Sequence, residues 1–352
     1  MRVAGVLSAA QNHLRACEFS LAAEVAAEAL GVLPPGAPAA ARRTLLNIHG
    51  VALHLLDDGA NAHESLAGAL QVALRAASSG DGGHDSYADV GGTLGDLAAN
   101  HIRNGELDAA DAALKRGTYM LKRAYRPSPT ASACLLNVRG CLHEARGELA
   151  SALNAHQEAH SLLLSVPGEP PPPHAGWLQA CRHGSAWAMI QLGDAAAAEM
   201  LCASDARADR LAPLDARERA LAQSRYAIAS LQRLYDDERV ARGDGDGGGR
   251  DAPSRAAPTA EARRAEAMRE LHIAAEALHT CLGDAHAEVH AAWHNLAVAR
   301  AAIDATAADA EDTPSWQRHW QPALGAGLWL SETPAWQPTS ATRTSPLERP
   351  DR

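Results

Sequence analysis

Residues 135–156, LLNVRGCLHEARGELASALNAH, carry the pattern that decides the fold. Gly140 and Ala152 stand twelve positions apart, and Ala159 follows seven positions later. Gly147 lies between the first two, and glycine is suited to the left-handed cap that ends a helix. Small residues at this spacing allow two helices to cross closely. The stretch therefore predicts an antiparallel helix pair.

The same pattern recurs elsewhere in the chain. LLNIHG at 45–50 resembles LLNVRG at 135–140, and GELDAADAAL at 105–114 and GDAAAAEMLC at 193–202 resemble GELASALNAH at 147–156. The small residues recur in register with these segments, as Gly50, Ala62 and Ala69 in one copy and Ala98, Ala110 and Gly117 in another. A recurring helix pair predicts a helical repeat protein, whose core forms where neighbouring pairs stack.

The composition also favours an all-α fold. The chain has 352 residues, of which 47% are apolar but only 4% aromatic, and Phe19 is the sole phenylalanine. Alanine has the highest helix propensity, whereas strands favour the β-branched and aromatic residues that are scarce here. The six cysteines include no C-x-x-C pair, which indicates reduced, packed thiols in an intracellular protein.

Charge and hydropathy narrow the choice of partners. The net charge of −10 argues against nucleic acid as a partner, because phosphate contacts need a basic face. The basic stretch at 115–126, KRGTYMLKRAYR, is interpreted as the solvated end of a helix or as a patch for an acidic partner. No run of 18 apolar residues occurs, so we expect no membrane partner. The N-terminus could pass for a weak transit peptide, but we interpret it as a first helix of a cytoplasmic protein.

In its repeated residues the chain resembles the tetratricopeptide repeat (TPR) family. One repeat matches the family pattern at Leu46, Gly50, Leu53, Ala62, Leu66 and Ala69. The segment at 282–300 is similar to the longer kinesin-light-chain type of repeat, at Leu282, Gly283, Asp284, His286, Val289, Asn295, Leu296 and Ala297. The chain has no heptad run of the kind that kinesin light chains carry at their N-terminus. A true kinesin light chain is therefore not expected.

The resemblance implies an α-solenoid of about six to seven antiparallel helix pairs, wound into a right-handed superhelix. We expect this solenoid to span residues 1–305, interrupted by a disordered Gly/Asp-rich insertion at 242–258. Residues 306–352 break the pattern and form a largely irregular tail. The tail holds four of the seven tryptophans, which could cap the end of the solenoid or dock a partner: Trp316, Trp320, Trp329 and Trp336.

TPR proteins line a concave groove with the first helix of each pair, which implies a set of partner-binding positions here. Carried over residue by residue, these are Asn47, His54, Arg103, Asn137, Glu144, His183, Trp187 and His294. The equivalent amides of Asn47 and Asn137 could bond the backbone of a peptide, and Trp187 could anchor it. The family's carboxylate clamp for chaperones is not matched, since residues 1–114 contain no lysine.

The histidines at 286, 290 and 294 raise the question of a metal site. His286 and His294 would lie about 12 Å apart along a helix, too far to share one zinc ion. We expect His156 and His160 on a partly exposed helical face. The chain has no H-E-x-x-H, G-x-S-x-G or phosphate-loop motif. We therefore predict no catalytic residue, metal or cofactor.

Together these features predict a protein-interaction scaffold or adaptor, which binds a peptide or helix of a protein partner in its groove. One alternative is a structural subunit or assembly factor of a larger complex, docking through the tryptophan-rich tail. A metal-dependent enzyme is the less favoured third class. The sequence does not identify the partner.

Overall fold

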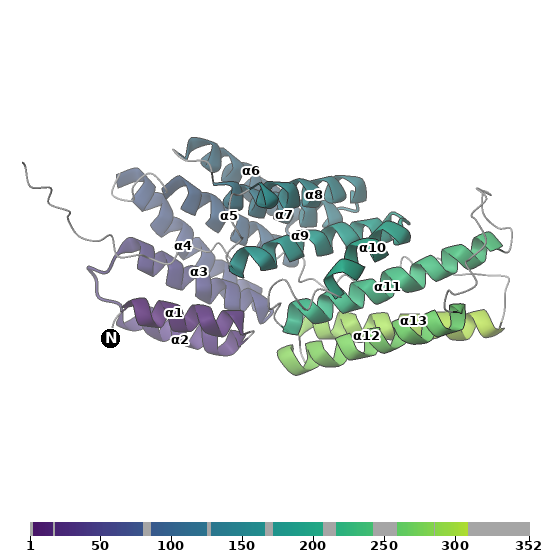
Figure 1. Ribbon diagram of the computed structural model, residues 1–352. Helices are drawn as coiled ribbons and strands as arrows, with labels where there is room; N and C mark the ends of the chain where they lie inside the picture. Colours follow the sequence, from purple (N-terminus) through teal and green to yellow (C-terminus); the bar gives the residue numbers. More distant parts are fainter. Residues whose placement is uncertain are drawn as a thin grey trace, which may run out of the picture.

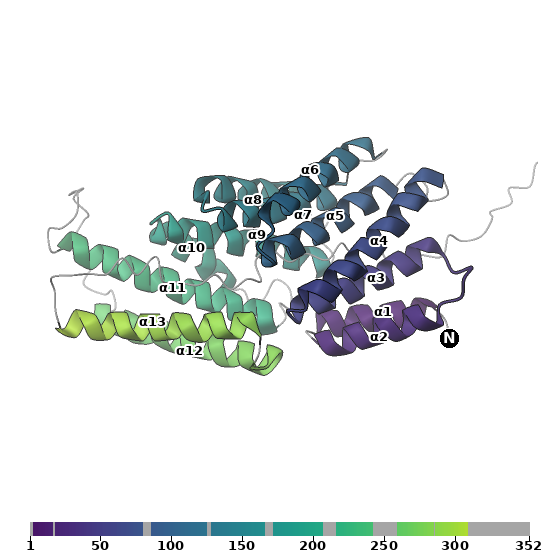
Figure 2. The same ribbon diagram turned by 180° about the vertical axis from the view of Figure 1, so that it is seen from behind.

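The computed structural model describes residues 3–16, 18–79, 86–124, 128–165, 172–206, 216–241, 259–284 and 286–308. These residues form thirteen α-helices and no strand (Figures 1 and 2). The helices are α1 (Val3–Arg15), α2 (Phe19–Val32), α3 (Ala39–Leu55), α4 (Gly59–Ser79), α5 (Ser86–Arg103), α6 (Leu107–Arg123), α7 (Pro129–Ala145), α8 (Leu149–Leu164), α9 (Pro172–Gln191), α10 (Ala195–Ala206), α11 (Ala216–Ala241), α12 (Ala260–Leu282) and α13 (Ala287–Ala308).

The helices stack as consecutive pairs. Each helix packs against the next one along the chain, and each odd-numbered helix also contacts the odd-numbered helix that follows it. We refer to α1, α3, α5, α7, α9, α11 and α13 as the odd row. Six pairs and a thirteenth helix make an α-solenoid, as predicted. The expected insertion at 242–258 and the tryptophan-rich tail lie outside the described residues.

Four of the turns inside the pairs share one geometry. Asp57, Gly105, Gly147 and Gly193 all have positive φ, at 66°, 76°, 74° and 84°. The next residue then donates its N–H to the carbonyl five positions back, as Glu148 does to His143 at 2.8 Å. The left-handed residue reverses the chain within three residues, because it directs the backbone away from the helix axis. The prediction that glycine ends the first helix of a pair is confirmed at three of these turns.

Small residues allow the paired helices to approach closely, as the spacing predicted. Ala62 and Ala152 are fully buried. A Cβ atom added at Gly50 would lie 2.7 Å from Leu66 Cγ and 3.2 Å from the Ala62 carbonyl oxygen. A larger residue at Gly50 would therefore push α3 away from α4.

The first and last repeats contact each other. The rings of Phe19 (α2) and His286, which directly precedes α13, lie 6.4 Å apart. Leu282 at the end of α12 packs against the hydrophobic cluster that contains Phe19 and Leu55. Both ribbon views show the α1–α2 pair beside the end of α12 and the start of α11 (Figures 1 and 2). We call this contact the closure.

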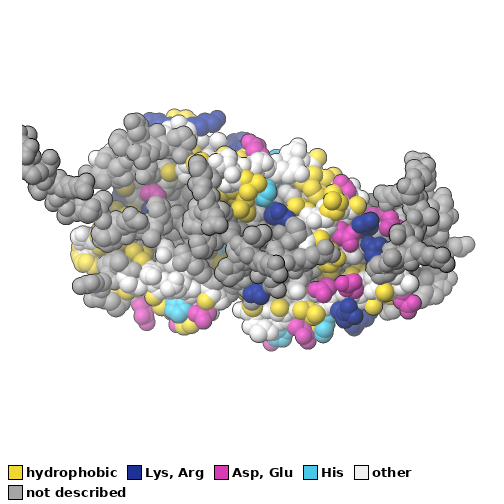
Figure 3. Space-filling model, in the orientation of Figure 1, with side chains coloured by type: hydrophobic (Ala, Val, Ile, Leu, Met, Phe, Trp, Pro, Cys, Tyr) yellow, Lys and Arg dark blue, Asp and Glu magenta, His cyan; other side chains and the backbone are white. Residues whose placement is uncertain are grey.

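The basic stretch forms the exposed end of α6. Lys115, Arg116, Lys122 and Arg123 all lie on this helix and are exposed. Arg123 stacks over the rings of Tyr87 and Tyr119, with 5.4 and 5.7 Å to the ring centroids. Basic side chains gather above α6 at the top of Figure 3, and acidic and basic groups are mixed near α10 to α13. No helix among the described residues is long and apolar enough to cross a membrane.

Candidate functional site

Buried polar side chains are concentrated on the odd row. Among the described residues, only Ser65 and His156 are buried polar residues of an even-numbered helix. The others lie on an odd-numbered helix or directly before one. Burying polar groups costs free energy unless they find partners, so this distribution marks the odd row as the chemically distinct part of the fold.

Hydrogen bonds join α3 to α5 along this row. Asn47 donates through Nδ2 to Thr93 Oγ1 at 3.3 Å. His54 Nδ1 lies 2.9 Å from Asn100 Oδ1, and Asn100 donates through Nδ2 to the Gly59 carbonyl at 3.1 Å. Since Asn100 Oδ1 only accepts, His54 carries its proton on Nδ1 and presents the lone pair of Nε2.

His54 and Arg103 each keep one polar atom without a protein partner. Arg103 donates through Nη1 to the His54 carbonyl at 2.5 Å and to Asp57 Oδ1 at 3.3 Å. Its Nη2 and the Nε2 of His54 have no hydrogen-bond partner in the described part of the chain. His54 is only 2% exposed. Burial, and next the charge of Arg103, lower the pKa of His54 to about 3, so its ring is neutral at neutral pH. The pair thus combines a buried acceptor with a buried donor.

A buried ion pair between α11 and α13 lies close to these two residues. Arg217 donates through Nε and Nη2 to the two carboxylate oxygens of Glu288, at 2.8 and 2.5 Å. Burial alone would raise the pKa of Glu288, but the charge and hydrogen bonds of Arg217 outweigh it and hold that pKa below its usual value. The charge of Glu288 also acts on His54 and on Arg103. The ends of the solenoid therefore converge on one polar site.

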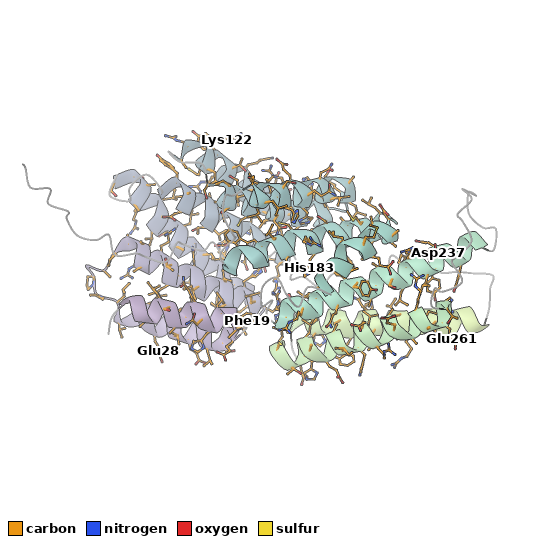
Figure 4. The ribbon with its side chains drawn as sticks, viewed as in Figure 1. Phe19, Glu28, Lys122, His183, Asp237 and Glu261 are labelled. Atoms are coloured by element: carbon orange, nitrogen blue, oxygen red, sulfur yellow. The ribbon has the colours of Figure 1, made fainter. Side chains whose placement is uncertain are left out.

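His183 lies on α9 (Figure 4), and the charge of Arg217 acts on it. Gln179 Nε2 lies 2.9 Å from His183 Nε2, so the amide donates to that nitrogen. Burial, and then the charges of Arg225, Arg217 and Arg182, lower the pKa of His183.

The remaining predicted site residues are spread over the odd row. Asn137 and Glu144 on α7 both bond the ring of His156, through Asn137 Oδ1 at 2.8 Å and Glu144 Oε1 at 3.2 Å. Trp187 is 6% exposed and packs in the cluster around Ile190, so it offers no exposed anchor. His294 on α13 is exposed, and the four tail tryptophans lie outside the described residues.

The expectation for one histidine is wrong, and two predicted asparagines already have partners inside the protein. His156 was expected on a partly exposed face but is fully buried, because its ring fills the space between α7 and α9. Asn47 and Asn137 were predicted to bond a peptide backbone through their amides; both are buried, and each bonds another side chain of the protein. Their role toward a partner stays a prediction.

Sequence reasoning missed Asn100, Arg217 and Glu288. Asn100 falls on the face of α5 that packs against α3, and its position could have been found from the repeat register. Arg217 and Glu288 are 71 positions apart and follow no periodic pattern. Among the described residues one group could hold a metal ion, Cys141, Glu144 and His156.

Comparison with known proteins adds little to this picture. The chain matches no protein-family model, and no curated protein matches its sequence. Among solved structures, the apo form of RapI superposes with a TM-score of 0.48 at 13% sequence identity, covering 87% of this chain and 72% of that one. By its own thirteen helices and their stacking, the chain is an α-helical repeat protein.

Proposed function

We propose that this chain is a protein-interaction scaffold, not an enzyme, and that it binds an extended peptide or a partner helix along the odd row. The observation that carries this proposal is the unpaired acceptor at His54 Nε2 beside the unpaired donor at Arg103 Nη2. Each buried polar atom without a partner costs about 1–3 kcal/mol. A peptide group brings one donor and one acceptor, so it matches both atoms.

The repeat geometry supports a TPR-like, protein-binding solenoid. Helices α3, α5, α7, α9 and α11 begin at residues 39, 86, 129, 172 and 216, which are spacings of 43 to 47 residues. These spacings suit the longer, kinesin-light-chain-like repeat that the sequence suggested. On this proposal the polar odd row supplies hydrogen bonds to a partner backbone, and stacked helix pairs hold them in place.

The first test is partner capture with full-length, tagged protein expressed in its native host. Proteins that co-purify with the wild type would be identified by mass spectrometry, and the tightest partner would be quantified against variants. Arg103→Gln removes the unpaired donor, and Arg116→Gln on exposed α6 is the matched control. We expect Arg103→Gln to reduce capture by about tenfold or more, and Arg116→Gln to leave it unchanged.

Two results would contradict binding along the odd row. One is a partner captured equally well by Arg103→Gln, once circular dichroism has shown that this variant folds. The other is a partner lost on Trp316→Ala with Trp320→Ala but kept by Arg103→Gln. That second pattern would favour the structural subunit that docks through its tail.

A further inference from the structure

His156 is an exception among the buried residues, because it places an imidazole inside the helix stack from an even-numbered helix. It lies on α8 and is fully buried. A Cβ atom added at Gly140 of α7 or at Gly184 of α9 would lie 2.5 Å from its Cε1 atom. The two glycines therefore leave space for this ring and hold its plane between two helix backbones.

The two ring nitrogens of His156 have different partners. Nδ1 lies 2.8 Å from Asn137 Oδ1, an atom that only accepts hydrogen bonds. Nδ1 therefore donates to Asn137, and Nε2 lies 3.2 Å from Glu144 Oε1. A buried imidazole nitrogen and a carboxylate oxygen at this distance are joined either by a proton or by a cation. A histidine that donates its other N–H to an oxygen acceptor is also the usual arrangement of a metal ligand.

A third donor distinguishes a metal site from a simple ion pair. Cys141, one turn before Glu144 on α7, presents its thiol to the same two side chains. The Cys141 sulfur, the Glu144 carboxylate and the His156 nitrogen all lie within 4.8 Å of one another. An imidazolium–carboxylate pair would have no use for the thiol. A sulfur, an oxygen and an imidazole nitrogen together form a donor set typical of zinc.

We propose that Cys141 Sγ, Glu144 Oε1 and His156 Nε2 bind one zinc ion between α7 and α8. Ligand atoms around a tetrahedral zinc ion lie about 3.5 Å apart, so the present positions need to close by only about 1 Å. Three protein ligands leave the fourth position open, and the half-buried Cys141 and Glu144 give access to it. This site goes beyond the proposed function, and it departs from the sequence analysis, which expected no metal.

Zinc binding at this site must release a proton. The Cys141 thiol becomes a thiolate when the zinc–sulfur bond forms, and its proton passes to solvent. Zinc affinity should therefore fall as the pH is lowered.

The test measures zinc on the purified, tag-free, full-length chain. After incubation with zinc sulfate and extensive dialysis, mass spectrometry should find about one equivalent of zinc per chain. Cys141→Ser and Glu144→Gln should each lower zinc affinity by about tenfold or more. The matched controls are Cys134→Ser on α7 and Glu158→Gln on the exposed side of α8, which should keep the wild-type content.

Cobalt substitution gives a second readout. The wild-type chain and Cys134→Ser should show a sulfur-to-cobalt charge-transfer band, which Cys141→Ser should lack. The proposal is overturned if the wild-type chain retains no stoichiometric zinc, or if folded Cys141→Ser retains it fully. Wild-type protein without zinc, combined with a lower melting temperature for Glu144→Gln, would identify a His156–Glu144 ion pair instead. If Cys141→Ser fails to fold, the cobalt charge-transfer band of the wild-type chain and the zinc affinity of Glu144→Gln test the proposal.

Discussion

Arg217 at the start of α11 and Glu288 at the start of α13 form a two-bond ion pair, at 2.8 and 2.5 Å, across 71 positions of sequence. Glu288 is completely shielded from solvent. The pair lies where the last repeats contact the first, so it belongs both to the core of the C-terminal repeats and to the closure.

Removing one member of this pair should destabilise the protein strongly. Glu288→Ala leaves the Arg217 guanidinium buried without its counter-charge, and we expect a loss of about 3–5 kcal/mol in the free energy of unfolding. Urea denaturation followed by circular dichroism would measure it. Glu276→Ala is the control, because its pair with His272 is exposed and should be worth less than about 1 kcal/mol. A loss no larger than that of the control would refute a buried pair.

Replacing both members should restore much of the stability. Arg217→Met combined with Glu288→Leu removes both charges and fills the space with apolar groups. Such replacements are often neutral or stabilising relative to a buried pair. The double variant should therefore unfold at a higher urea concentration than Glu288→Ala. Equal midpoints for the two variants would mean that Glu288 acts through something other than Arg217.

Stability should fall as the pH is lowered from neutral. The pKa of His54 is about 3 in the folded protein, against an ordinary value of 6.5. The neutral ring's contribution to the free energy of unfolding is therefore complete above pH 6.5 and is lost as the pH falls toward 3. Over this interval the unfolded chain binds one proton more than the folded protein. The free energy of unfolding therefore falls by about 1.4 kcal/mol for each pH unit. His183, with a lowered pKa, adds to the same trend. Urea midpoints at pH 7.5 and 5.5 would measure the loss, which should be smaller in His54→Gln. A pH-independent midpoint would contradict this prediction.

Gly140 should not tolerate even one methyl group. Gly140→Ala would place Cβ 2.5 Å from the His156 ring, which Gly184 prevents from moving away. We expect a loss of about 1–3 kcal/mol by thermal denaturation. In Gly31→Ala, also within a helix, the new Cβ meets nothing within 4 Å, so this control should be neutral or stabilising. Equal melting temperatures for the two variants would show that the α7–α8 contact is not tight.

Asp194 and Glu148 follow the left-handed glycine of equivalent turns but should differ in their effect on stability. Asp194 accepts the Ala197 N–H through Oδ1 at 3.2 Å and so caps α10, whereas Glu148 makes no such cap and lies 2.6 Å from His143 Nδ1. Asp194→Ala should cost about 1 kcal/mol, and Glu148→Ala at most about half of that. Thermal melts of the two variants test this, and the opposite order would contradict it.

The local part of this fold was predictable from the sequence. Gly140 with Ala152 and Gly50 with Ala62 defined the pairs, because close helix crossing requires small residues at set positions. Gly147 predicted its turn for an equally local reason.

The candidate site was less predictable, because it depends on contacts between repeats. A polar residue on the first helix of a pair can face a ligand or bond the neighbouring helix, and Asn47 and Asn137 do the latter. His156 occupies a position where the pattern gave no reason to expect burial, since its space comes partly from Gly184 of the next pair. Glu288 meets Arg217 only once α11 and α13 have packed together.

The closure also affects how the chain is made. In an open solenoid each repeat meets only its neighbours, so folding can follow synthesis from one end. Here the rings of Phe19 and His286 lie 6.4 Å apart although the two residues are 267 positions apart along the chain. Such non-local contacts raise the contact order and slow the final step of folding. If the described part of the chain folds from its N-terminal side, the polar residues of α3 and α5 stay uncovered until α11 and α13 are in place, so the first repeats are completed by helices far along the sequence.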